Sequence, residues 1–190
     1  MTDRAPLVLA AAAAAAAFVA GLWAAPASAQ APAGVQPTQI GEFKDWNAYS
    51  APVKGGKVCY ALATPQKSRR RSSQPPEGAY FFISNRPQDG VNNEVSVMPG
   101  FQLKAGSEVE LTVDGTTFKM FTRGDGAFMG NNEDQAALVD AMRGGRRDMS
   151  VEATPSRGKK STQSYSLAGL SAALDKINQD CRAAAAPKAR

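Results

Sequence analysis

Hydrophobic and polar residues alternate most regularly in the stretch EVELTVDGTTFKMFTR, residues 108–123. Val109, Leu111 and Val113 alternate with polar residues, and the apolar residues after the following turn alternate in the same way. A period of two places one set of side chains on a single face of a strand. Asp114 and Gly115 stand where a tight hairpin needs two residues with positive φ. The pattern predicts a β-hairpin.

Six further segments have the length and composition of short strands, and most are separated by Gly, Pro, Asn or Asp. This spacing is typical of an antiparallel sandwich or barrel. Large rings in strands usually fill a core, so we expect most of the aromatic residues between 46 and 82 to be buried. The predicted strands are residues 43–50, 57–64, 79–86, 93–98, 148–155 and 161–167.

Two segments have the period of a helix instead. In the first, NNEDQAALVDAMRGG, Asn132 is the predicted N-cap, with Gln135 three residues further on, and Gly144 is the predicted end. The second, LSAALDKINQDC, carries an apolar stripe that includes Cys181 in its last turn. This stripe turns the Cys181 side chain toward the sheet.

The N-terminus has the layout of a secretory signal peptide, with Arg4 in a short charged start, an apolar run over residues 7–25, and small residues at Ala27 and Ala29. A membrane anchor is the alternative, but the run is mostly alanine and ends in a cleavage pattern. We expect cleavage after Ala29. The predicted organisation is a signal peptide at 1–29, a flexible lead-in at 30–39, one β-sandwich domain at 40–182 and a disordered tail at 183–190.

The chain has two cysteines and no histidine. Thiols that reach an oxidising compartment generally form disulfides, so export predicts a Cys59–Cys181 bond, with two buried free thiols as the alternative. Two distant cysteines without histidine do not form a zinc site, and no C-x-x-C redox pair is present. We therefore expect no metal and no cofactor.

The formal net charge is +5. In an envelope compartment this charge favours an anionic envelope or host-surface component over nucleic acid, and it is compatible with peripheral contact with a membrane. The segment KSRRRSSQPPEG predicts a basic loop between strands, and its guanidinium groups suit phosphate or sulfate. A solvated loop is the alternative reading. The candidate residues are Lys67, Arg69, Arg70 and Arg71, with Arg146, Arg147, Arg157, Lys159 and Lys160 as further basic residues if the fold brings them near.

Changing Arg69, Arg70 and Arg71 together to Ser should leave the melting temperature nearly unchanged, because the loop lacks apolar anchors. Retention on immobilised lipopolysaccharide or sulfated glycan should fall, most visibly at low ionic strength, where exposed charges are least screened. Equal retention of mutant and wild type at low salt would identify the segment as a solvated linker.

The chain resembles the invasion-associated locus B family of exported proteobacterial proteins. The resemblance covers the whole domain after the signal peptide, and the order and spacing of its motifs carry it. It implies an immunoglobulin-like β-sandwich, a location in the periplasm or at the outer membrane or cell surface, and, in pathogenic members, a link to host-cell invasion. It supplies no catalytic residue and no ligand. The motifs are GEFKDWNAYS, KVCYALATPQK, FFISNRP, NEVSVMPGF, VDGTTFKMFT, DQAALVDAMRGG and SYSLAGLSAALDKINQDC.

The absence of histidine removes the commonest general base. Asp125, Glu133 and Asp134 are close in sequence, but their setting is that of a turn and a helix N-terminus, where acidic residues offset the helix dipole. The tripeptide Arg123-Gly124-Asp125 matches the integrin-recognition sequence, and we interpret it as a turn. The predicted function is non-enzymatic binding or adhesion that supports host-cell association or invasion. The alternatives are an envelope hydrolase that acts on cell-wall or glycan material and a structural periplasmic factor. The sequence predicts no oligomeric state.

Overall fold

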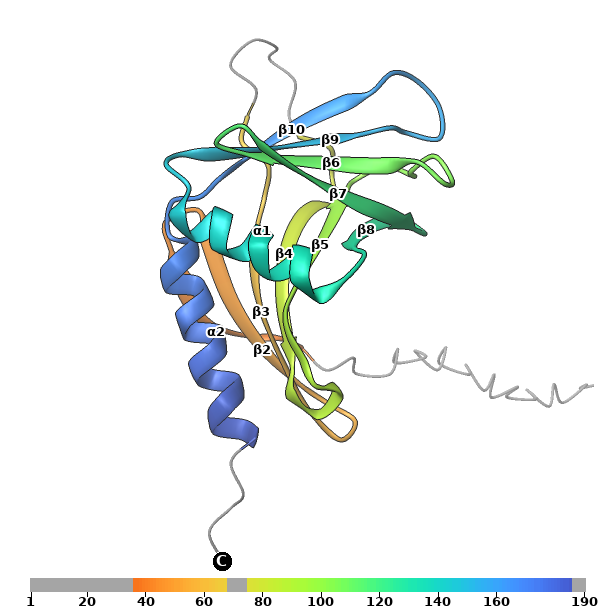
Figure 1. Ribbon diagram of the computed structural model, residues 1–190. Helices are drawn as coiled ribbons and strands as arrows, with labels where there is room; N and C mark the ends of the chain where they lie inside the picture. The colour runs from red at the N-terminus through yellow and green to blue at the C-terminus, as the bar shows by residue number, and fades with distance from the viewer. Residues whose placement is uncertain (1–35, 68–74, 186–190) are drawn as a thin grey trace, which may run out of the picture. The chain divides into compact units, whose positions relative to one another are not determined.

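The computed structural model describes residues 36–67 and 75–185. This part of the chain contains ten strands, a short 3-10 helix and two α-helices (Figure 1). Their order is β1 (Thr38–Phe43), β2 (Trp46–Val53), β3 (Gly56–Ala63), β4 (Ala79–Arg86), η1 (Pro87–Asp89), β5 (Val91–Pro99), β6 (Glu108–Val113), β7 (Thr116–Arg123), β8 (Gly126–Met129), α1 (Asn132–Gly144), β9 (Asp148–Ala153), β10 (Ser161–Ser166) and α2 (Leu170–Ala185).

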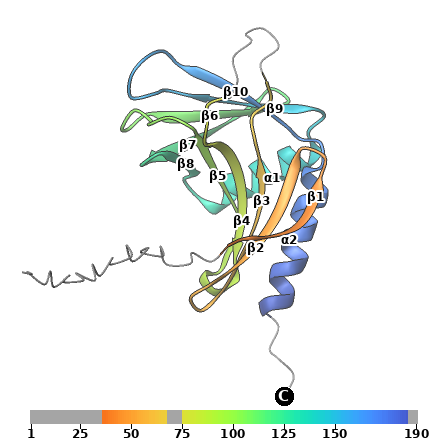
Figure 2. The same cartoon turned by 180° about the vertical axis from the view of Figure 1, so that it is seen from behind.

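All the strands pair antiparallel in one open sheet of order β1-β2-β3-β4-β5-β8-β7-β6-β9-β10. The two halves of this sheet meet at β5 and β8, where only two residue pairs, Ser96–Phe128 and Val97–Ala127, join them. Beyond this joint the sheet turns, so that β6, β9 and β10 run across the direction of β2–β5 (Figures 1 and 2). The predicted all-β, sandwich-like class with a C-terminal helix is confirmed.

The core lies between the two halves of the sheet and α2. Trp46 of β2 packs edge-on against Phe81 of β4, and Phe81 in turn contacts Tyr165 of β10. All three are fully buried. Their polar atoms are satisfied, since Trp46 Nε1 donates to the Ser166 carbonyl at 2.8 Å and Tyr165 Oη donates to Gln163 Oε1 at 2.9 Å. The ring cluster therefore joins the first strands of the chain to the last.

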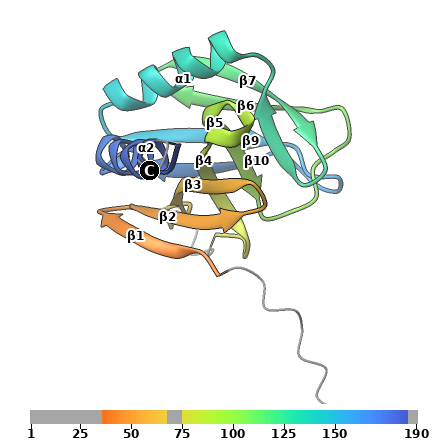
Figure 3. The same ribbon diagram turned by 90° about the horizontal axis from the view of Figure 1, so that it is seen from below.

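Helix α2 lies along β1–β4, and Figure 3 shows it at one end of the space between the two halves of the sheet. The predicted stripe of Leu170, Leu174, Ile177 and Cys181 is buried. Burial of a Leu or Ile side chain is worth about 1.5–3 kcal/mol. Most of the stability of this helix therefore comes from the stripe. Within the part of the chain that the structure describes, no helix is long and apolar enough to span a membrane.

The predicted hairpin at 108–123 is confirmed as β6 and β7, with Val113 opposite Thr116. Asp114 and Gly115 both have positive φ, at 45° and 90°. Asp114 also accepts a hydrogen bond from the backbone N–H of Arg146 at 3.1 Å. The turn therefore holds the start of the segment that leads into β9.

Two local predictions were wrong. Residues 43–50 were predicted as one strand, but Lys44 adopts a φ of 54° and begins a tight turn, so that Phe43 pairs with Trp46 and the chain doubles back into β1 and β2. Asn132 was predicted as the N-cap of α1, but Asn131 has this role, because its Oδ1 accepts the backbone N–H of Asp134 at 2.8 Å. The cap lies one residue earlier than predicted.

The prediction for the aromatic residues holds for Trp46 and Phe81 only. Because side chains alternate between the two faces of a strand, the neighbours of Phe81 point outward. Half-buried rings on the outer face form a ladder across β2, β3 and β4, in which Tyr49 stacks on Tyr60 with centroids 5.2 Å apart. Burial raises the pKa of the Tyr60 phenol, and the neighbouring Tyr49 adds to this effect. Phe82 and Tyr80 complete the ladder.

Candidate functional site

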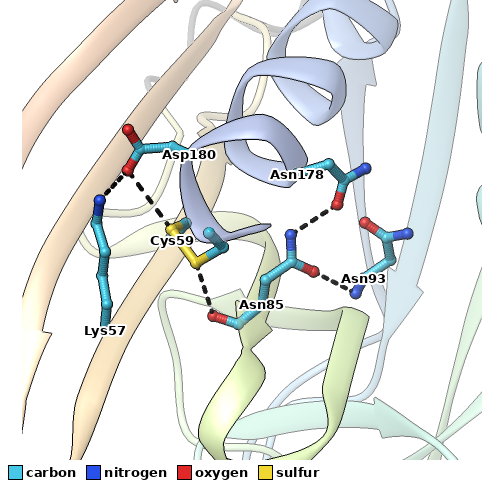
Figure 4. Close-up of a disulfide and its surroundings, with 7 residues drawn as sticks. Lys57, Cys59, Asn85, Asn93, Asn178 and Asp180 are labelled. Atoms are coloured by element: carbon cyan, nitrogen blue, oxygen red, sulfur yellow. Dashed lines mark hydrogen bonds and ion pairs between the residues drawn. A yellow bond between two sulfur atoms is a disulfide. The ribbon is translucent and has the colours of Figure 1, made fainter. Parts of the chain in front are cut away.

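Cys59 and Cys181 form a disulfide in the structure (Figure 4). Cys59 is on β3 and Cys181 is in the last turns of α2, 122 residues further along the chain, with the Cα atoms 5.9 Å apart. Lys57 of β3 and Asp180 of α2 form an ion pair beside it. The bond attaches the C-terminal helix to an early strand. Its surroundings are those of a structural cross-link.

A buried asparagine lies next to the disulfide. Asn85 of β4 is 2% exposed; its Nδ2 donates to Asn178 Oδ1 at 2.7 Å, and its Oδ1 accepts the backbone N–H of Asn93 at 2.6 Å (Figure 4). Asn93 has a φ of 49° and lies where the pairing of β4 and β5 shifts register. The amide of Asn85 therefore links β4, β5 and α2.

Replacing Asn85 with Ala should lower the free energy of unfolding by about 1–3 kcal/mol, because it leaves the Asn93 N–H and the Asn178 side chain without their partner. Asn178→Ala is the matched control. It removes only one of the two bonds, at a half-buried position, and should have a smaller effect. Urea denaturation measures both. Equal effects of the two substitutions would show that Asn85 does not stabilise the register shift between β4 and β5.

The predicted basic loop is only partly described. Arg69, Arg70 and Arg71 lie outside the described residues, and Lys67 follows the end of β3. Gln66 donates its backbone N–H to the Ser164 carbonyl at 2.7 Å and its Nε2 to Asp148 Oδ1 at 3.0 Å. The structure therefore brings Lys67 to the end of the β9–β10 hairpin where Arg146 and Arg147 precede Asp148. Arg157, Lys159 and Lys160 belong to the opposite end of this hairpin.

The tripeptide at 123–125 forms the turn between β7 and β8, as predicted. Arg123 pairs with Gly126, and Gly124 and Asp125 are the two turn residues, with Gly124 at a φ of 61°. Glu133 and Asp134 lie in the first turn of α1, where the predicted favourable interaction with the helix dipole applies. The sequence-based interpretation of these acidic residues is confirmed.

An open groove of about 990 Å³ lies where the β4–β5 hairpin, the β7–β8 hairpin and the start of α1 meet. We call it the corner groove. It forms here because β8 pairs with β5 only at Ser96 and Val97, which leaves the first half of β5 without a strand on that side. The lining residues are Arg86, Asp89–Glu94, Phe121, Arg123, Phe128–Asn132, Gln135, Ala136, Val139 and Asp140.

One side of the corner groove holds an ion cluster. Arg86 Nη1 donates to Glu94 Oε2 at 2.8 Å, and Arg86 Nε is 3.5 Å from Asp89 Oδ2. The hydrogen bond to Glu94 raises the pKa of Arg86, so this guanidinium stays cationic throughout the pH range of a folded protein. Because the pair is partly exposed, it contributes at most about 1 kcal/mol to stability. This side of the groove therefore carries one cationic and two anionic groups.

Two phenylalanines of the β7–β8 hairpin also line the groove. Phe121 of β7 and Phe128 of β8 are cross-strand partners with ring centroids 6.0 Å apart. Phe121 is 46% exposed, one of three large hydrophobic residues that are exposed in the described part of the chain. An exposed ring at the rim of a polar cavity has no role in the core. It marks the groove as a candidate contact surface.

Part of the amide lining is engaged in holding the groove together. Gln135 Oε1 accepts the backbone N–H of Val95 at 3.3 Å, and Gln135 Nε2 donates to the Asn92 carbonyl at 3.4 Å. Asn131 bonds to Asp134 through both of its side-chain polar atoms, as the cap of α1. Gln135 therefore fastens the first turn of α1 to the otherwise unpaired edge of β5.

The corner groove offers carboxylate, guanidinium and amide groups. Among the described residues that line it there is no Ser, Thr, Cys, Lys, Tyr or His, so the lining offers no hydroxyl, thiol or amine nucleophile and no imidazole base. Throughout residues 36–67 and 75–185, no three His, Cys, Asp or Glu side chains are placed to hold a metal ion.

This site could not be predicted from the sequence because its residues come from three separate segments of the chain. The sequence does contain one indication of the site. Phe121 follows Met120 directly, so it breaks the alternation of β7 and places an apolar ring on the face where polar residues are expected.

The fold and the groove define a disulfide-linked all-β domain with an open groove at one corner of its sheet. A family model described as Invasion associated locus B (IalB) protein matches residues 46–178, and the chain belongs to this family. A search of curated proteins and a search of solved structures gave no match.

Proposed function

We propose that the protein is an exported envelope protein that acts by non-enzymatic binding and supports association with, or invasion of, host cells. Membership of the Invasion associated locus B family supports the link to invasion. The Cys59–Cys181 disulfide suits an oxidising compartment, in agreement with the proposed signal peptide at residues 1–29. Those residues lie outside the described part of the chain.

The observation that carries the binding proposal is the composition of the corner groove. A cavity of about 990 Å³ has the size of a ligand site, and such sites combine apolar rings with a few polar groups that fix orientation. The exposed Phe121 supplies the apolar contact, and Arg123 supplies a guanidinium at the same rim. The lining offers no hydroxyl, thiol, amine or imidazole, and two of its three carboxylates, Asp89 and Glu94, are paired with Arg86, which supports binding rather than catalysis.

Phe121→Ala should reduce the retention of an envelope or host-surface partner at least about tenfold, equivalent to about 1.4 kcal/mol. The physical reason is the loss of a large exposed ring, the kind of residue that dominates contact surfaces. The bait is the exported full-length protein, immobilised and exposed to envelope extract and to host-cell surface extract.

Met98→Ala is the matched control. Met98 is 41% exposed, is also a large apolar side chain on the sheet, and does not line the corner groove. Partner retention should survive this change. Retention that is unaffected by Phe121→Ala, or turnover of the captured material, would contradict the proposal.

A further inference from the structure

We propose that the corner groove binds a saccharide, in the form of a short chain of neutral or N-acetylated sugar rings. This inference rests on the proposed function and names the class of ligand for the same site. It follows from three features of the lining. These are an exposed aromatic platform, planar polar groups beside it, and an edge of β5 whose backbone groups are already hydrogen-bonded and cannot pair with an added peptide strand.

The platform is the pair Phe121 and Phe128. A pyranose ring presents a face of C–H groups that packs well on a flat apolar ring, while its hydroxyls point outward around the rim. Phe121 is 46% exposed and is supported from one side by Phe128 at 6.0 Å, so its ring is held in place without being covered. Such pre-organisation lowers the entropy lost on binding.

The polar groups around this platform are planar and offer paired donors and acceptors. Arg123, Asn92, Asn132 and Asp140 line the same groove. Guanidinium, amide and carboxylate groups each present two polar atoms in a fixed plane, a spacing that suits adjacent hydroxyls on a sugar ring.

The charge of the groove argues against an anionic ligand. Two guanidinium groups, of Arg86 and Arg123, lie among three carboxylates, of Asp89, Glu94 and Asp140. Because Arg86 is already paired with Glu94 and lies near Asp89, it is not free to take a phosphate. A neutral polyhydroxylated ligand fits this balance better.

The edge of β5 argues against an extended peptide. A peptide that joins a sheet needs free backbone groups on an edge strand. In this groove the Val95 N–H and the Asn92 carbonyl are both bonded to the side chain of Gln135. The position that an added strand would occupy is therefore taken by α1.

Titration calorimetry on the exported full-length protein tests the inference. The probes are a tetramer of N-acetylglucosamine, maltotetraose and, as the anionic comparison, a heparin tetrasaccharide. We expect one of the two neutral probes to bind with one-to-one stoichiometry and to bind more tightly than the anionic one.

Two variants should weaken binding of that neutral probe at least about tenfold: Phe121→Ala and Arg123→Gln. Two controls should bind it as wild type does. Phe121→Tyr keeps the ring, and Met98→Ala changes a residue outside the groove. Unchanged melting temperatures establish that the variants are folded.

The negative outcomes separate the two proposals. If neither neutral probe binds while Phe121→Ala still abolishes partner retention, the saccharide inference is wrong and the binding function stands. If Phe121→Ala changes neither the binding of the probes nor the retention of any partner, both the saccharide inference and the proposed binding function are wrong. A probe that binds wild type and Phe121→Ala equally well, or a heparin fragment that binds most tightly, also overturns the saccharide assignment.

Discussion

Replacing Gly169 with alanine should lower the free energy of unfolding by about 2–6 kcal/mol, as the sum of overpacking and backbone strain. Gly169 precedes α2 and has a φ of 92°. A Cβ atom at this position would lie 1.9 Å from the Phe43 carbonyl oxygen and 2.7 Å from its carbon. Those atoms belong to the backbone of the β1–β2 hairpin, where Asp45 donates its N–H to the Ala168 carbonyl. The hairpin or the helix has to move.

Gly158→Ala is the matched control for this substitution. Gly158 also has a positive φ, of 104°, but a Cβ atom there would meet nothing within 4 Å. Only backbone strain is added there, so the free energy of unfolding should fall by about 1–3 kcal/mol, less than at Gly169. Thermal or urea denaturation of both variants measures the difference. Similar losses at the two positions would show that the contact between Gly169 and Phe43 does not hold the helix in place.

Removing the Cys59–Cys181 disulfide should lower the free energy of unfolding by about 2–5 kcal/mol. The bond closes a long loop, with a sequence separation of 122, and it connects a buried strand to the buried stripe of α2. A bond over such a distance strongly restricts the unfolded chain. The double variant Cys59→Ala and Cys181→Ala removes it without leaving a lone thiol.

Reduction of the wild-type protein supplies an independent comparison. Chemical denaturation in the presence of a reductant should give a stability close to that of the double alanine variant. A reduced wild-type protein as stable as the oxidised one would contradict the role assigned to the bond. So would free thiols in the protein purified without a reductant.

Local patterns predicted the elements that depend on local chemistry. β4 begins and ends where its alternation predicts, and the Asp114-Gly115 turn has the predicted positive φ values. The buried stripe of α2 follows from its helical period. The turn at Lys44 was missed because it uses a residue with no special preference for positive φ. β8 was missed because four residues, Gly126–Met129, are too short to show a period.

The candidate site was not predictable in the same way. The corner groove exists because β5 extends beyond the two residues that pair with β8. This depends on the order of strands in the sheet rather than on any single segment. Arg86, Phe121 and Gln135 come together only through that topology. Even so, the outward position of Phe121 followed from the register of the hairpin that the sequence did predict.

Site-directed photocrosslinking tests most directly whether partners bind at the corner groove. A photoreactive phenylalanine analogue at position 121 of the full-length protein should form covalent adducts with envelope or host-surface material. The same analogue at position 53, where Val53 is exposed at the end of β2 and outside the groove, should form none. Adducts at position 53 alone, or at both positions equally, would contradict binding at the corner groove.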